Sequence, residues 1–109
     1  MAESKDTIKS KLIEYSKLVR KEFDVYKILL YGSYAKGLQK SDSDIDVAVL
    51  LNLNDKRKKI EISKRLFLLA RKIDIRIEPK CVFESELENL EPVSILSDIL
   101  RNSEEIIIN

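Results

Sequence analysis

One segment constrains the fold and chemistry of this chain most: residues 31–51, which read YGSYAKGLQKSDSDIDVAVLL. It predicts two short apolar strands joined by a polar loop. Successive side chains of a strand point to opposite faces, so Asp44 and Asp46 are expected on one face, with Ile45 on the other. Two such carboxylates repel by roughly 4 kcal/mol at 4 Å with an effective dielectric of about 20. The pair therefore indicates a site for a divalent cation.

Gly32 and Ser33, at the end of the first predicted strand, suit phosphate binding. Glycine lets the backbone approach a ligand closely, and serine offers a hydroxyl and a backbone N–H near the start of a helical turn. A Walker P-loop is excluded, because Leu38 and Gln39 stand where that motif requires Lys and Ser or Thr. For the glycines alone, a plain glycine-terminated turn is the alternative. Taken together with the carboxylates, they indicate nucleotide chemistry.

The pattern G-S-x-A-x-G, followed by S-D-x-D and an apolar run, resembles the signature of the DNA polymerase beta-type nucleotidyltransferase superfamily. Residues 73–80, IDIRIEPK, resemble the strand that carries the third carboxylate of that superfamily. The compact length is similar to that of its minimal nucleotidyltransferases. The resemblance implies an α+β fold like the polymerase palm, with a small mixed sheet, helices packed on one face and the carboxylates on the open face.

The resemblance also implies a site for two Mg²⁺ ions and a nucleoside triphosphate, by family habit ATP. Its catalytic residues, which also bind the metal, would be three carboxylates: Asp44, Asp46 and Asp74. Its nucleotide-binding residues would be Gly32, Ser33 and Lys36. Glu78 follows on the same predicted face as Asp74 and stays open as the third carboxylate if the strand register differs. The alternation over residues 73–78 taken alone is typical of an ordinary strand with one wet face.

The implied reaction moves a nucleoside monophosphate, AMP from ATP, to an acceptor hydroxyl with release of pyrophosphate. Minimal members of the superfamily often pair with a small helical HEPN-domain protein, and some act as antitoxins by transferring AMP to a tyrosine of that partner. The alternative is a non-catalytic antitoxin or binding module that neutralises such a partner by contact. The presence of Ser33 with all three matched carboxylates favours catalysis.

The composition of the chain limits which classes of protein and of function remain possible. The 109 residues are enough for one domain and no second one, and the resemblance implies a single nucleotidyltransferase domain over 1–109. The chain has no histidine, which excludes imidazole catalysis, and carboxylate ligands favour a hard ion such as Mg²⁺. The lone Cys81 fits a reducing cytoplasm. A net charge of +1 argues against strong nucleic-acid binding, and no apolar run approaches the roughly 20 residues of a membrane span.

Hydrophobic periodicity predicts the order of elements along the chain. The predicted helices cover residues 4–23, about 56–72 with Ile60 and Phe67 in a broad apolar face, and Pro92 to about Arg101. The predicted strands cover residues 24–31, 47–51 and 73–78, with Pro79 ending the last one or placing it at an edge. Residues 82–91 are expected to form a connection. Residues 106–108 are expected either to close the sheet or to contact a second copy of the chain.

Four consecutive basic residues, Lys56 to Lys59, open the second predicted helix. Positive charge in a first turn opposes the helix dipole by up to a few tenths of a kcal/mol for each residue. The run is either a solvated helix start or a site that attracts phosphates or an acidic partner.

Overall fold

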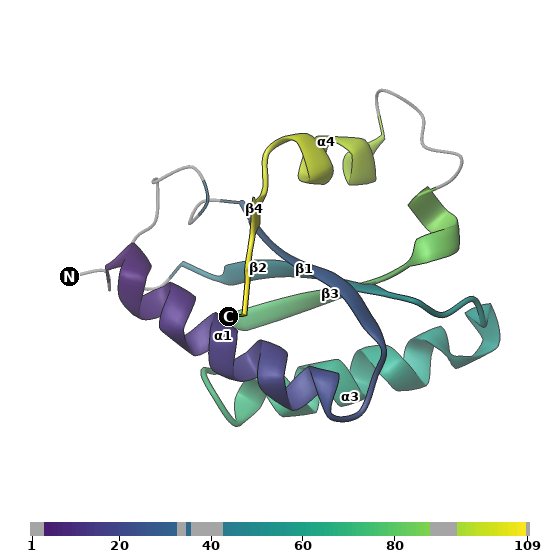
Figure 1. Cartoon of the computed structure of the whole chain (residues 1–109), viewed down its shortest axis with the longest axis horizontal. Helices are drawn as coiled ribbons and strands as arrows, with labels where there is room; N and C mark the ends of the chain where they lie inside the picture. The colour runs from purple at the N-terminus through teal and green to yellow at the C-terminus, as the bar shows by residue number, and fades with distance from the viewer. Residues whose placement is uncertain (1–3, 33–34, 36–42, 88–93, 109) are drawn as a thin grey trace.

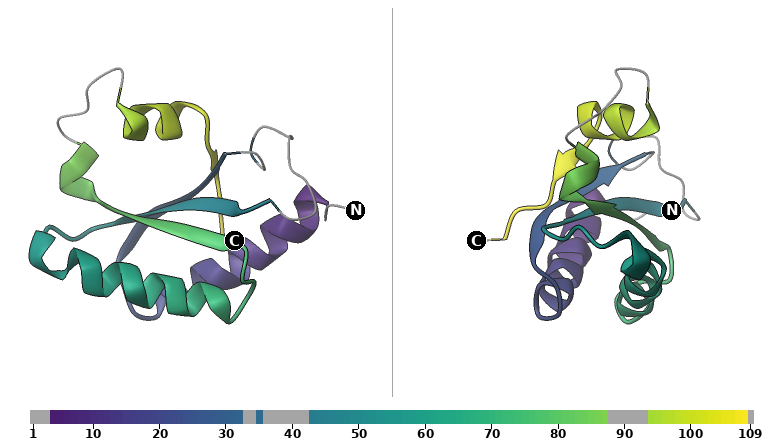
Figure 2. Two further views of the ribbon diagram at one scale, coloured as in Figure 1. Left: turned by 180° about the vertical axis from the view of Figure 1, so that it is seen from behind. Right: turned by 90° about the vertical axis from the view of Figure 1, so that its right-hand side faces the viewer.

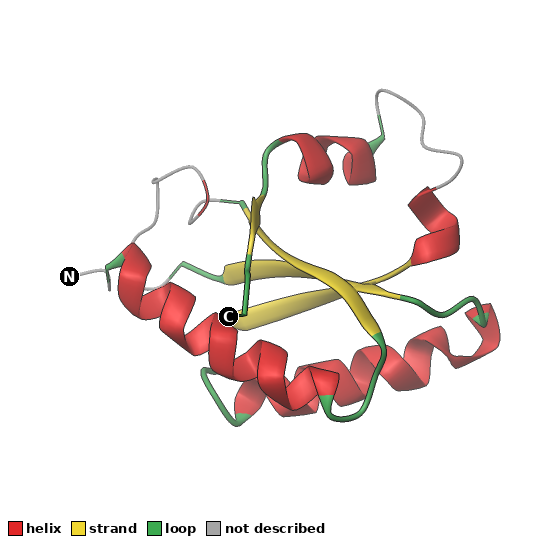
Figure 3. Ribbon diagram, viewed as in Figure 1, coloured by secondary structure: helices red, strands yellow, loops and turns green. Residues whose placement is uncertain are grey.

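The computed structural model describes residues 4–32, 35, 43–87 and 94–108. Its centre is a four-stranded sheet in the order β3-β2-β1-β4 (Figure 3). The strands are β1 (Val25–Tyr31), β2 (Ile45–Leu51), β3 (Ile77–Phe83) and β4 (Glu104–Glu105). β2 pairs with β3 in parallel, whereas β1 is antiparallel to both of its neighbours. The predicted α+β class and mixed sheet are confirmed.

Helices cover both faces of the sheet. α1 (Lys5–Arg20) and α3 (Lys59–Arg71), the latter preceded by the 3-10 turn η1 (Lys56–Lys58), lie on one side, and α4 (Ile95–Arg101) lies on the other (Figure 1). A second 3-10 turn, η2 (Glu84–Leu87), follows β3. The prediction that all helices pack on one face is therefore wrong for α4. Among the described helices, none combines the length and apolar composition of a membrane span.

The larger apolar layer lies between the sheet and the α1–α3 pair (Figure 2). α1 begins where the Ser4 side chain accepts a hydrogen bond from the Thr7 backbone N–H at 3.2 Å, as an N-cap does. The spacing of its apolar residues puts four fully buried side chains on one stripe: Ile8, Leu12, Tyr15 and Val19. The Tyr15 hydroxyl donates to the Leu66 carbonyl at 2.9 Å, which satisfies a buried polar group and ties α1 to α3.

The second apolar layer is smaller and lies under α4. Ile99 packs there against side chains from three strands: Leu29, Ala48, Leu50 and Val82. These alternate along their strands with residues of the first layer, as the period of a strand requires. Ala48 and Leu50 are fully or almost fully buried, whereas Asp46, two residues before Ala48 on the same face, keeps part of its surface exposed.

The structure corrects the predicted position of the third strand. β3 begins at Ile77 rather than at residue 73 and runs through residues 82 and 83, which were predicted to belong to a connection. Ile75, which the alternation over residues 73–78 would place on the dry face of a strand, is 74% exposed. Pro79 does not end the strand. It is tolerated because β3 is an edge strand, as the sequence allowed.

The second helix and the C-terminus also differ in detail from the prediction. α3 buries four residues, Ile62, Leu66, Leu69 and Ala70, but Ile60 is 71% and Phe67 37% exposed. β4 precedes the predicted segment 106–108, although the Ile106 N–H still donates to the Ile28 carbonyl at 2.8 Å. The predicted first turn of the last helix, with Pro92, lies outside the described residues, and α4 begins after the N-cap Ser94.

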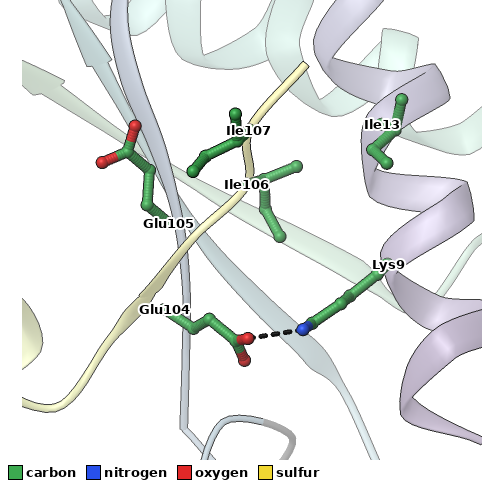
Figure 4. Close-up of a pocket in the computed structure, with 6 residues that line it drawn as sticks. All are labelled: Lys9, Ile13, Glu104, Glu105, Ile106 and Ile107. Carbon is green, nitrogen blue, oxygen red and sulfur yellow. Dashed lines mark ion pairs between the residues drawn. The ribbon is translucent and has the colours of Figure 1, made fainter. Parts of the chain in front are cut away.

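A pocket of about 290 Å³ separates the C-terminal segment from α1 (Figure 4). Lys9 of α1 and Glu104 of β4 form an ion pair at 2.5 Å on one side of it. Ile106 is buried, whereas Ile107 is 61% exposed. The C-terminal segment therefore closes the sheet through its backbone and one of its isoleucines.

Candidate functional site

The carboxylates predicted to bind metal come from the sheet end where β1 stops and β2 and β3 start. The strand register places Tyr31 opposite Asp46 in the antiparallel pair, and Asp46 beside Glu78 in the parallel pair. Three strands therefore contribute one row of side chains: Tyr31, Asp46 and Glu78. Paired residues in neighbouring strands are about 4.5–5.5 Å apart, so the row brings a phenol and two carboxylates within reach of a common ligand.

This row belongs to the face of the sheet that carries α4. Ile45 and Val47, which flank Asp46, are buried in the layer under α1 and α3, and so is Ile77 beside Glu78. Side chains alternate along a strand, so Asp46 and Glu78 point the other way. Tyr31 packs against the α4 layer, which agrees with this placement. Asp46 is partly buried and Glu78 is exposed.

Gly32 lies directly against the Asp46 carboxylate. Its φ of +74° is in the left-handed region that favours glycine. A Cβ atom at this position would come within 2.4 Å of Asp46 Oδ2, too close for any side chain. Only glycine lets the chain leave β1 here without displacing the carboxylate.

The acidic side chains at this row lie close together, without a compensating positive charge from the residues that the structure describes. Partial burial raises the pKa of Asp46, and the charges of Asp44 and Glu78 raise it further. Burial raises the pKa of Tyr31 as well, with added contributions from Asp46 and Glu78. Within the described part of the chain, no basic side chain forms an ion pair with Asp44, Asp46 or Glu78.

Asp44, Asp46 and Glu78 have the chemistry of a hard-metal site, because carboxylate oxygens are the donors that Mg²⁺ prefers. A cation among them would reverse the repulsion that raises the pKa of Asp46. In residues 4–32, 35, 43–87 and 94–108, no three His, Cys, Asp or Glu side chains are arranged so that they could hold a metal ion as they stand. Asp44 and Glu78 are exposed, so their side chains have room to turn toward a bound ion. The residues fit the ion by donor type and charge.

Asp74 lies in a different environment. It occupies the turn between α3 and β3, and its side chain is only 8% exposed. Oδ2 accepts from Lys11 Nζ at 2.9 Å and from Arg76 Nη2 at 2.7 Å, while Oδ1 accepts from the Arg76 Nε and backbone N–H. The Arg76 guanidinium is the main cause of a pKa well below the usual range for Asp74, and Lys11 adds to the effect. The structure brings Asp44 and Asp46 together with Glu78. Asp74 is instead paired with two cationic side chains, Lys11 and Arg76.

The turn around Asp74 nevertheless determines the geometry of the site. The Asp74 side chain orders the backbone of Arg76, whose carbonyl accepts the Ile45 N–H at 2.8 Å. This hydrogen bond comes immediately before the pair Ile45–Ile77 and fixes the register of β2 on β3. Asp74 thus helps to place Glu78 beside Asp46 without touching either of them.

Ser33 and Lys36, predicted to bind the triphosphate, lie outside the described residues. Sequence reasoning did not identify Tyr31 as a site residue. The available signal was its position immediately before Gly32, at the end of a strand predicted to neighbour the one that carries Asp46.

Comparison with known proteins identifies the family. The sequence matches the model of the nucleotidyltransferase domain over residues 12–104. The chain belongs to this family. It is 38% identical over 74 residues to the protein named "Putative protein adenylyltransferase MJ0141" of Methanocaldococcus jannaschii, covering 58% of this chain and 72% of that protein. It is 40% identical over 48 residues to "Putative protein adenylyltransferase MJ1379" of the same organism, covering 44% of this chain and 48% of that protein.

Solved structures of other proteins share the fold. The crystal structure of a protein named a putative nucleotidyltransferase, from Sulfolobus solfataricus, superposes with a TM-score of 0.66 at 16% identity. The match covers 93% of this chain and 80% of that one. A toxin–antitoxin structure with AMP-PNP gives a TM-score of 0.56 at 25% identity, covering 91% and 72% of the two chains. The resemblance drawn from the glycine and carboxylate motifs is confirmed, and the transferase class follows from the family.

Proposed function

We propose that this nucleotidyltransferase domain transfers AMP from ATP to an acceptor hydroxyl, with Mg²⁺ held by Asp44, Asp46 and Glu78. The observation that carries the proposal is the row Tyr31–Asp46–Glu78 with Gly32 against the central carboxylate. The sequence predicted Asp74 as the third carboxylate. Its pairing with Lys11 and Arg76 favours Glu78 instead, which the sequence had left open.

The chain's own groups have distinct tasks in this reaction. Asp46 and Asp44 would hold a Mg²⁺ ion, and the Gly32 backbone, with Ser33 and Lys36 after it, would bind the phosphates of the triphosphate. A Glu78 oxygen accepts the proton of the acceptor hydroxyl, whose oxygen bonds to the α-phosphorus. The bond from that phosphorus to the bridging oxygen breaks, and pyrophosphate leaves. When bound, Mg²⁺ supplies charge stabilisation for the phosphoryl oxygens and lowers the pKa of the hydroxyl.

The acceptor hydroxyl belongs, in this proposal, to a partner protein. The likeness to a toxin–antitoxin structure with AMP-PNP supports a nucleotide and a partner protein. The family resemblance implies that this partner is a small helical HEPN-type protein that carries the accepting tyrosine. The same likeness supports a second candidate function, a contact antitoxin that binds its partner without transferring anything. The two differ in whether the carboxylate row is needed.

Calorimetric titration tests the first candidate. The titrant is an ATP analogue with a methylene bridge between the α- and β-phosphorus, which cannot release pyrophosphate, added with and without Mg²⁺. The native chain is expected to bind it only with Mg²⁺. Asp46→Asn is expected to weaken binding on the order of 100-fold, and Glu78→Gln about 10-fold, because each removes a carboxylate charge that the ion requires. Glu14→Gln, on the exposed side of α1, is the matched control and should bind like the native chain.

Two results would change the assignment. If Asp74→Asn weakens binding like Asp46→Asn while Glu78→Gln does not, the third carboxylate is Asp74, as the sequence predicted. If Asp46→Asn binds the analogue as well as the native chain does, the carboxylate row is not a nucleotide site. Copurification of a helical partner with that variant would then leave the contact antitoxin as the function.

A further inference from the structure

The basic residues of this chain are concentrated in the segment around α3. Residues 56–72 contain eight basic residues and one acidic residue, so their net charge is +7, whereas the whole chain carries +1. The rest of the chain is therefore acidic. Such an asymmetry indicates a surface that attracts a partner of opposite charge.

The outer side of α3 combines this charge with exposed apolar side chains. Ile60 is 71%, Leu68 53% and Phe67 37% exposed. They lie opposite the residues that α3 buries in the core, at positions i, i+7 and i+8, which fall on one side of a helix. A groove of about 410 Å³ beside Phe67 and Leu68 is lined by these two residues together with Ser63 and Lys64. We name this surface, Ile60 with the four lining residues and Arg71, the outer face of α3.

Only some of the basic side chains of this segment are neutralised within the chain. Lys59 pairs with Glu86, and Arg65 donates two hydrogen bonds to Glu22 at 2.7 Å. Arg71 lies over the Phe67 ring, 5.5 Å from its centroid. No carboxylate of the described residues lies within ion-pair distance of four exposed lysines, Lys56, Lys58, Lys64 and Lys72. Lys64 lines the groove, Lys56 and Lys58 precede α3, and Lys72 follows it.

This surface is separate from the carboxylate row. α3 and α4 lie on opposite sides of the sheet (Figure 2). α3 packs on its side through Ile62 and Leu66, whereas Asp46 alternates with residues of that layer and therefore points to the side of α4. Lys64, which lines the groove, therefore lies on the other side of the sheet from a triphosphate held at Asp46. The charge of this surface calls for a different ligand.

We propose that the outer face of α3 is a docking surface for an acidic amphipathic segment of a partner protein. Apolar side chains of that segment fill the groove lined by Phe67 and Leu68, and its carboxylates pair with Lys64 and with the lysines at both ends of α3. The 13 residues of α3 span about 20 Å, which matches a partner helix of three to four turns. Carboxylates bound near residues 56–58 also offset the unfavourable position of positive charge at the helix start.

Nucleic acids and membranes suit this surface less well. Base stacking uses an open aromatic ring face, and Arg71 already covers Phe67. An interfacial helix inserts a whole apolar face into the lipid, whereas α3 uses its larger apolar face in the core and leaves only Ile60, Phe67 and Leu68 outside.

A synthetic probe tests the docking surface without knowledge of the natural partner. The probe is a fluorescent helical peptide of leucines at i, i+3, i+4 and i+7 with glutamates elsewhere, and its control has lysines in place of the glutamates. Fluorescence anisotropy is expected to show that the native chain binds the acidic peptide, at least 10-fold more tightly at low than at high salt, and ignores the basic one.

Matched variants locate the binding. Lys64→Glu and Leu68→Gln are expected to weaken it at least 10-fold, since they remove the charge and the apolar wall of the groove. Lys17→Glu on α1 and Tyr26→Ser on β1 change an exposed charge and an exposed ring elsewhere. These two controls should bind like the native chain. All four variants are expected to keep Mg²⁺-dependent binding of the ATP analogue, so failure of this proposal and failure of the proposed nucleotide site give different results.

Three outcomes would overturn the docking proposal. The first is no binding of the acidic peptide at low salt. The second is equal weakening by Lys17→Glu and Lys64→Glu, which would show diffuse charge attraction only. The third is tighter binding, lost in Leu68→Gln, of single-stranded RNA or of phosphatidylserine vesicles, which would make the outer face of α3 a nucleic-acid or membrane surface.

Discussion

Two acidic residues near the same end of the sheet have opposite electrostatic environments. Asp74 accepts hydrogen bonds from Lys11 and Arg76, and its pKa is lowered. Asp46 has two further carboxylates for neighbours, and its pKa is raised. The difference comes from the sides they face: Asp74 is reached by a lysine of α1, and Asp46 points to the opposite face of the sheet.

A carboxylate that already has its counter-ions contributes to folding, whereas one without them is available to a ligand. The contrast explains why sequence similarity alone does not decide the third carboxylate. Asp74 matches the family motif by position, but its negative charge is already neutralised within the chain. Glu78 keeps its charge exposed beside Asp46. Variants of the two sites should therefore respond in opposite directions.

The largest effect on stability is expected from Asp74→Asn, which leaves Lys11 and Arg76 without their shared carboxylate. Its free energy of unfolding at pH 7 should fall by about 2 to 3 kcal/mol, less than for a fully buried pair because both cations are partly exposed. A lowered pKa stabilises the fold above the unfolded-state value of about 4, and the stabilisation is lost as pH falls toward the folded-state value. Urea unfolding of both proteins should thus converge at acid pH. A gap that persists or widens there would contradict this account.

Gly32→Ala should have the next largest effect, about 1 to 2 kcal/mol of lost stability. A left-handed backbone costs a residue with a Cβ roughly 1–2 kcal/mol, and the new methyl group meets Asp46 Oδ2. The double variant Gly32→Ala with Asp46→Ala removes that oxygen and should recover part of the loss. Simple additivity of the two single changes in thermal unfolding would show that the glycine and the carboxylate are not in contact.

Asp46→Asn should have the smallest effect and the opposite sign. Without metal at neutral pH it is expected to be more stable than the native chain by about 0.5 kcal/mol, a value discounted for partial exposure. A raised pKa favours the fold below the unfolded-state value of about 4, and that contribution is lost as pH rises through the folded-state value. The advantage of the variant should therefore grow with pH.

Mg²⁺ should reverse this order, since it stabilises the protein that binds it and not the variant. Thermal unfolding with and without Mg²⁺ measures both effects. A native chain that is more stable than Asp46→Asn in the absence of metal would mean that the carboxylate row is satisfied by groups within the protein.

The sequence predicted the elements with strong periodicity and the residues of one motif. α1, α3 and the first two strands follow from their apolar spacing, and Asp46 follows from a charge inside an apolar run. The third strand could not be placed in this way. Ile73, Ile75 and Ile77 alternate like a strand, but the Asp74 side chain accepts the Arg76 N–H and holds a turn, which leaves Ile75 exposed. A local side-chain hydrogen bond overrode the pattern.

The hydrophobic pattern also did not predict that α4 packs on the other face of the sheet. The apolar residues of β2 read as one continuous run, so the sequence did not separate those that pack under α1 and α3 from those under α4. The apolar residues after Pro79, Cys81 to Phe83, did carry a signal for a longer strand. Because an edge strand tolerates proline, that signal deserved more weight than the break suggested by Pro79.

The hydrogen bond from the Ile45 N–H to the Arg76 carbonyl helps to fix the alignment of β3 on β2, and an error in this alignment would lower the stability of the fold. If β3 slid by one residue along β2, Glu78 would turn into the apolar layer and Ile77 would turn out to water. A misaligned molecule would thus bury an unpaired carboxylate and lose stability at once. Correct alignment and a functional acidic row are obtained together, so a population of stably folded but chemically inert molecules has no easy way to form.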